Sequence, residues 1–158
     1  MKIDIRALPN DLLGLLPASV QDIVCLIGVQ AALRLVSAWP GRTFPVSRNK
    51  RLDGRVRFEA LAEVVGHDAA EILSRHYADS ELYIPQCAIA MRELRDRLIR
   101  ADFDRITGSE GHSARAAVVM LVDAYGVSDR HVWRVLNRAD WSAKNYNSQQ
   151  ADLFSVPL

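Results

Sequence analysis

The stretch from Ser113 to Arg138 constrains the fold most, because its apolar residues follow a helical spacing that one glycine interrupts. The apolar residues before the interruption are Val118, Leu121, Val122 and Tyr125. They recur at intervals of three and four residues, as the buried face of a helix does. Gly126 follows directly, and glycine readily takes the left-handed conformation that ends many helices. With Val127 as an apolar residue under the turn, the pattern predicts two packed helices joined by a tight connection.

The second of these helices is expected to begin at Ser128. The serine hydroxyl can accept a hydrogen bond from the backbone amide of Arg130 or His131. Apolar residues at helical spacing then hold the second helix on the first, and they are Val132, Val135 and Leu136.

Side chains on the outward face of this second helix are of the kinds that contact phosphates and base edges in a DNA major groove. The candidate DNA-binding residues here are Ser128, Arg130, His131, Trp133, Arg134, Asn137 and Arg138. Helical pairs of this kind also occur in many proteins that never bind nucleic acid. Taken alone, the segment leaves a DNA-binding unit and a plain helical pair as alternatives.

The N-terminal half shows self-similarity with a period of 38 residues. Gly28, Ala31, Ala32, Leu35 and Trp39 fall on Gly66, Ala69, Ala70, Leu73 and Tyr77. Each copy, at about 18–47 and 56–85, is expected to form a helix, a second helix, a turn and a short strand. The strands Thr43–Ser47 and Glu81–Pro85 can pair as a ribbon. We interpret residues 1–85 as one pseudo-twofold association unit, with chance similarity of two amphipathic segments as the alternative.

Basic residues gather between the two copies, where Arg42 to Arg57 contains a single acid, Asp53. We interpret this stretch as a mobile loop in which Arg48 and Arg51 contact phosphates. A solvated charged loop without a ligand is the alternative.

The rest of the chain divides into a helical domain and a tail. An arginine-rich amphipathic helix is expected from Gln86 to about Asp104, as the first helix of a DNA-binding domain over residues 86–140. Residues 141–158 are expected to be a flexible tail containing Gln150, Leu153 and Phe154. These three resemble the peptide with which bacterial proteins dock on the replication sliding clamp. Packing of the two apolar residues on the chain's own core or on a partner subunit is the alternative.

Composition limits the possible classes of function. Of the 158 residues 49% are apolar, which is enough for a sizeable core, and the formal charge of +1 argues against coating nucleic acid by bulk electrostatics. Neither a secretory signal nor a membrane span is apparent in the sequence, so we expect a cytoplasmic location. The two cysteines, Cys25 and Cys87, are expected to be core thiols. The histidines lack metal-ligand spacing and no phosphate-binding loop is present, so no enzyme, metal or cofactor is expected.

The segment Leu82-Tyr83-Ile84-Pro85, an arginine-rich helix and the turn Tyr125-Gly126-Val127-Ser128 together resemble the Mor transcription activator family. The resemblance covers Leu61 to Arg138, with a weaker second copy over Leu26 to Ser47. It implies a dimeric, phage- or prophage-encoded activator whose N-terminal helices and strand form the dimer core. Its C-terminal helix-turn-helix would enter the major groove near a promoter and help to recruit RNA polymerase.

By position, the resemblance makes Ser128 to Arg138 the recognition helix and Arg130, Arg134 and Arg138 the leading DNA contacts. Asp129 would repel phosphate unless it caps the helix, accepts from a cytosine amine or faces away. The duplicated N-terminal unit departs from the family pattern, since one chain could build internally what the family builds from two. Monomer and homodimer therefore both stay open.

We therefore expect an all-α fold with a short two-stranded β element and a C-terminal helix-turn-helix. The expected function is sequence-specific binding of duplex DNA to regulate transcription, as an activator or a repressor. A protein-interaction adaptor that docks on a partner such as the sliding clamp is the alternative. The operator sequence and the host process do not follow from the sequence.

Overall fold

The computed structural model describes residues 3–47, 52–78 and 80–138. These are mainly helical, with one short two-stranded antiparallel sheet, which confirms the predicted fold class. The described residues form two compact units, Ile3–Leu94 and a second that begins at Arg95. The division falls inside helix α5 (Ala88–Asp104), whereas the sequence placed a boundary before Gln86.

The first unit begins with two short 3-10 turns, η1 (Ile5–Ala7) and η2 (Asn10–Leu15). They bury four apolar side chains, those of Ile5, Leu8, Leu12 and Leu16. Turn η1 contacts helix α2 (Val29–Ala38), which follows helix α1 (Ala18–Ile27). The start of the chain thus covers one side of α2. On α1, Cys25 is exposed, so the expectation of a core thiol is wrong for this cysteine, whereas Cys87 is buried as expected.

Two pairs of helices make up most of this unit, α1 with α2 and α3 (Leu52–Val65) with α4 (His67–His76). A single glycine joins the helices of each pair. Gly28 has φ 82° and ψ 162°, and Gly66 has φ 95° and ψ 157°. This combination of positive φ and extended ψ is essentially restricted to glycine. The glycines that the sequence marked as helix ends therefore set both inter-helix bends.

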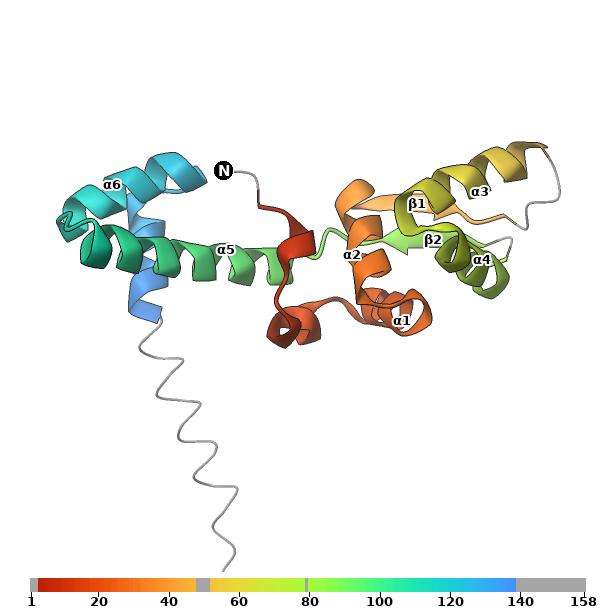
Figure 1. Ribbon diagram of the computed structural model, residues 1–158, viewed down its shortest axis with the longest axis horizontal. Coiled ribbons are helices and arrows are strands. Elements are labelled where there is room, and N and C mark those ends of the chain that lie inside the picture. Colours follow the sequence, from red (N-terminus) through yellow and green to blue (C-terminus); the bar gives the residue numbers. More distant parts are fainter. Residues whose placement is uncertain (1–2, 48–51, 79, 139–158) are drawn as a thin grey trace, which may run out of the picture. The chain divides into compact units, whose positions relative to one another are not determined.

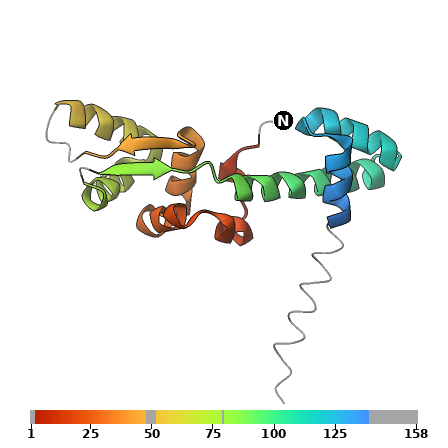
Figure 2. The same cartoon turned by 180° about the vertical axis from the view of Figure 1, so that it is seen from behind.

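Each helix pair is followed by a strand, β1 (Arg42–Pro45) or β2 (Glu81–Ile84). The strands run antiparallel with Phe44 opposite Leu82, and their arrows point in opposite directions in Figures 1 and 2. Leu82 and Ile84 are buried while Tyr83 between them is exposed, as expected of a ribbon with one covered face. The predicted pairing of the two extended segments is confirmed.

The interpretation of Arg42–Arg57 as one loop is wrong at both ends. Arg42 begins β1, and α3 starts at Leu52, so Arg55 and Arg57 lie on a helix. The helix forms because Phe58, Leu61 and Val65 recur at helical spacing and are buried. Asp53 in its first turn also suits the positive end of the helix dipole. Arg48 and Arg51 lie outside the described residues.

The second unit contains the C-terminal part of α5, a π-helical turn η3 (Arg105–Ser109), α6 (Ala114–Tyr125) and a further helix over residues 129–138. Ser113 caps α6, since its side chain accepts from the amide of Ala116 at 3.3 Å. The core of the unit is made by Ile99, Ile106, Val118, Leu121, Val132 and Val135.

Candidate nucleic-acid interface

The turn between α6 and helix 129–138 has the local geometry that the sequence predicted. Gly126 adopts the left-handed conformation, with φ 62° and ψ 36°, and its amide donates to the carbonyl of Val122 at 2.9 Å. The hydroxyl of Ser128 accepts from the amide of His131 at 3.2 Å, so Ser128 caps the next helix. The two helices are therefore joined by a short connection, with a backbone hydrogen bond at the end of α6 and a side-chain cap at the start of the next helix.

Burial fixes which face of helix 129–138 points outward. Val132 is fully buried and Val135 is 2% exposed, and on α6 Leu121 and Tyr125 are also buried. The hydroxyl of Tyr125 donates to Asp102 Oδ2 on α5 at 2.6 Å. Burial and this carboxylate raise the pKa of the tyrosine well above its usual value, so the bond is present at neutral pH. One side of helix 129–138 is thus buried, and α6 is bonded to α5.

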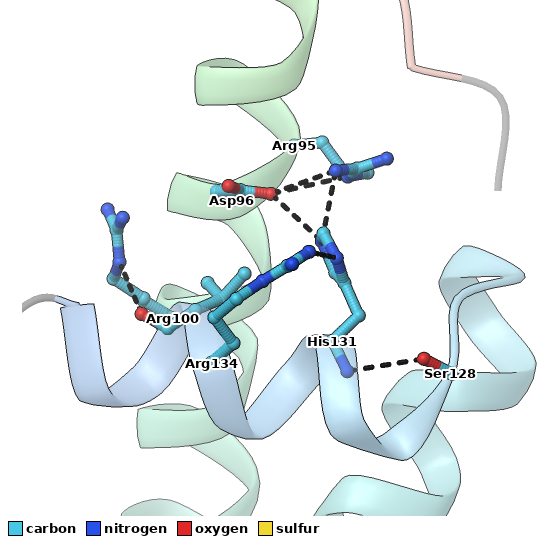
Figure 3. A network of polar contacts seen from close by, with 7 residues as sticks. Arg95, Asp96, Arg100, Ser128, His131 and Arg134 are labelled. Carbon is cyan, nitrogen blue, oxygen red and sulfur yellow. Dashed lines mark hydrogen bonds and ion pairs between the residues drawn. The ribbon is translucent and has the colours of Figure 1, made fainter.

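A polar network ties helix 129–138 to α5, as Figure 3 shows. Its centre is Asp96, a carboxylate that is only 3% exposed. Asp96 Oδ1 accepts from Arg95 Nε at 3.3 Å and from Arg95 Nη2 at 3.2 Å, and it lies 3.4 Å from His131 Nε2. One turn further along both helices, Arg100 Nε donates to the carbonyl of Val135 at 3.4 Å. These contacts fix which side of helix 129–138 faces α5.

His131 stands between two guanidinium groups. Arg95 Nη2 lies 3.0 Å from His131 Nε2, and Arg134 Nη2 lies 2.5 Å from His131 Nδ1. A neutral imidazole has only one acceptor nitrogen, so it can accept from only one of the two arginines. The third neighbour of the ring, Asp96 Oδ1, can accept from Nε2 only when that nitrogen carries the proton. His131 thus contacts both Arg95 and Arg134 and joins helix 129–138 to α5.

The predicted DNA-binding residues on this helix fall into two groups. Most are exposed: Ser128, Arg130, Trp133, Arg134, Asn137 and Arg138. His131 instead is half-buried against α5, which suits a supporting role better than contact with a ligand. Asp129 is exposed and accepts from the amide of Arg130 at 2.7 Å. The other predicted sites, Arg48 and Arg51 and the tail residues Gln150, Leu153 and Phe154, lie outside the described residues.

Two supporting residues were not singled out from the sequence, Arg95 and Asp96. A signal for Asp96 was present, since it precedes Ile99 by three residues and Phe103 by seven and so shares their side of the helix. An acid on the covered side of an arginine-rich helix requires a buried partner. What the spacing could not indicate is that the partner would be His131.

Within the described ranges, no cluster of three or more potential metal-ligating side chains occurs. None of the helices described there is long and apolar enough to cross a membrane.

Comparison with known proteins identifies a family. The model of the Mor transcription activator family matches residues 42–153, which is more than half of the chain. Neither the curated proteins nor the solved structures contain a significant match.

Proposed function

Because the chain belongs to the Mor transcription activator family, we propose that it reads duplex DNA in a sequence-specific manner through helix 129–138. The family is one of transcription regulators and not of enzymes. In this proposal α6 and helix 129–138 form a helix-turn-helix, and the exposed face of the second helix enters the major groove.

The observation that carries the proposal is a row of arginines along one face of helix 129–138. Arg130, Arg134 and Arg138 follow each other at four-residue intervals, and all three are exposed. Guanidinium groups match both phosphates and the guanine edge. Trp133, 40% exposed on the same helix, adds apolar contact area.

The position of Asp129 is compatible with this ligand. Its carboxylate accepts a hydrogen bond from the amide of Arg130, in the first turn of the helix. There the exposed backbone amides offset a negative charge that would otherwise repel phosphate.

Selection of sites from a random duplex library, followed by binding titrations at several salt concentrations, tests the proposal. We expect one enriched motif. Replacing Arg134 by Ala is expected to weaken binding to that motif by about 1–3 kcal/mol if the arginine reads a base. If it contacts a phosphate, the loss of binding affinity is similar for all DNA sequences. The slope of the logarithm of the binding constant against the logarithm of the salt concentration then falls by about one.

Arg75→Ala is the matched control, because it also removes one exposed arginine but lies on α4, where Arg75 pairs with Glu71 at 2.9 Å. The control should bind DNA like the unmodified protein. Absence of any enriched motif, or equal binding by the Arg134→Ala and control proteins, contradicts the proposal.

The family also motivates the rest of the proposal, that the chain activates a phage or prophage promoter together with RNA polymerase. A reporter carrying the selected motif upstream of a weak promoter tests this part. Increased transcription that Arg134→Ala abolishes supports activation, while decreased transcription indicates a repressor.

The adaptor hypothesis rests on Gln150, Leu153 and Phe154 and becomes the leading one if no DNA motif is found. It predicts that purified sliding clamp retains the full chain and not a variant that lacks residues 148–158.

A further inference from the structure

The two halves of the N-terminal unit match in backbone conformation. Gly28 and Gly66, 38 residues apart, differ by only 13° in φ and 5° in ψ. Each glycine amide donates at 2.8 Å to the carbonyl four residues earlier, in Val24 and Ala62 respectively. Each glycine carbonyl in turn accepts from the amide four residues later. The same helix bend is therefore built twice.

The buried positions of the two halves also match. Val20, Ile23, Ala32, Leu35 and Val46 of the first half are buried, and so are Phe58, Leu61, Ala70, Leu73 and Ile84 at the corresponding positions of the second. Two unrelated amphipathic segments would not be expected to share their buried positions through two helices and a strand.

Packing crosses between the halves in a reciprocal way. Helix α1 contacts α4, and α2 contacts α3, which is the equivalent pair when the halves are exchanged. In the ribbon, Phe44 lies opposite Leu82, its own counterpart in the other half. A local twofold axis through this pair relates the two halves, so each half completes the core of the other.

The halves differ at one pair of equivalent positions, where the first half has an apolar residue and the second half has a charged one. Leu33 on α2 is 1% exposed, and η1 packs against that helix. The counterpart of Leu33 is Glu71 on α4, which lies near His67 and pairs with Arg75. The first half therefore has η1 packed against α2, and the second half has a charged, ion-paired residue at the position equivalent to Leu33.

We infer that residues 18–84 are an association core closed within a single chain, so that the protein acts as a monomer that reads one unsymmetrical DNA site. This inference rests on the proposed DNA-binding function. A symmetric dimer presents two reading helices and selects inverted half-sites about one helical turn apart. A single chain with an internally closed core presents one helix 129–138 and selects a motif without inverted symmetry.

Strand β1 of the first half ends at Pro45, and helix α3 of the second half begins at Leu52, so the connection between the halves is short. A short tether gives the two halves a high effective concentration for each other, which favours pairing within one chain over pairing between chains.

Two measurements test the closure, one on the native chain and one on a cross-linked variant. Light scattering combined with size-exclusion chromatography of the full-length chain should give the mass of one chain, 17.7 kDa, at all concentrations. In the variant, Thr43→Cys and Tyr83→Cys place two thiols at directly opposed, exposed positions of the ribbon, and Cys25→Ser removes the exposed native thiol. Oxidation should link the two strands within one chain.

Thr43→Cys alone, with Cys25→Ser, is the control, because it has no partner thiol across the ribbon. Denaturing gels without reductant should show the variant with both new cysteines at the size of one chain. A thiol assay should show that these two cysteines no longer react. A two-chain mass in solution, or a ribbon cross-link between two chains, overturns the inference.

The DNA motif separates failure of this inference from failure of the proposed function. An enriched motif without inverted symmetry, bound by one chain, supports both. An inverted repeat bound by two chains overturns the monomer inference and leaves DNA reading intact. A monomeric protein that enriches no motif overturns the proposed function, and with it the claim about the DNA site.

Discussion

Replacing the two bend glycines by alanine is a quantitative test of the fold. A Cβ added at Gly28 or Gly66 would meet nothing within 4 Å, so alanine introduces no clash with other residues. The whole penalty is therefore the backbone strain of φ 82° and φ 95°, which is about 1–3 kcal/mol for a residue other than glycine. A less flexible unfolded chain offsets about 0.4–1 kcal/mol of this. We expect each variant to lose about 1–2 kcal/mol of unfolding free energy.

Two other glycines calibrate the expectation. Gly14 has no positive φ and open space around it, so Gly14→Ala should be neutral or slightly stabilising. Gly126 lies in the left-handed helical region, where a residue with a Cβ loses about 1–2 kcal/mol before the same offset. The expected order of destabilisation is Gly28 and Gly66 together, then Gly126, then Gly14.

Urea unfolding followed by far-ultraviolet circular dichroism measures these differences, with the midpoint compared at equal slope. Gly28 and Gly66 lie in the same compact unit, so their substitutions affect the same folded structure. Equal losses at the two sites support the local twofold axis. Unchanged stability in either variant, or a loss at one site several times that at the other, refutes the assignment of equivalent bends.

Three further changes have expected outcomes. Tyr125→Phe removes the bond to Asp102 and should lower the free energy of unfolding by about 1–2 kcal/mol; an unchanged urea midpoint contradicts this. Ser128→Ala removes the cap of helix 129–138 and should cost about 1 kcal/mol, visible as a lower thermal midpoint, whereas full retention shows that the cap is dispensable. Iodoacetamide at mildly alkaline pH should label the folded chain once, at exposed Cys25, because burial raises the pKa of the Cys87 thiol to about 11. Mass spectrometry identifies the labelled site, and equally fast labelling of Cys87 would show that it is accessible.

Several features of the fold followed from local sequence alone. The bend at Gly126, the cap at Ser128 and the two pivots at Gly28 and Gly66 each depend on the conformational preference of one residue and its near neighbours. The ribbon followed from the 38-residue spacing of its strands. Such features are readable because a short stretch of chain contains all the groups that stabilise them.

The start of helix α3 could not be predicted from the local sequence in this way. The run of charged residues before Phe58 suggested a loop, yet the helix extends back to Leu52. Burial of Phe58, Leu61 and Val65 stabilises the helix, which contacts α2 and α4, and the exposed basic residues follow on its solvent side. Charge density reports exposure, and an exposed segment can be a helix as readily as a loop.

By itself the sequence determined most of the outward face of the last helix, because a helical period assigns faces without knowledge of the partner. Only the tertiary structure decided that His131 turns toward α5, where it meets buried Asp96, while its other ring nitrogen contacts Arg134. It also decided that helix α1 packs against α4. Both depend on contacts between residues more than thirty positions apart, and no local periodicity specifies which distant side chain a polar or apolar group will meet.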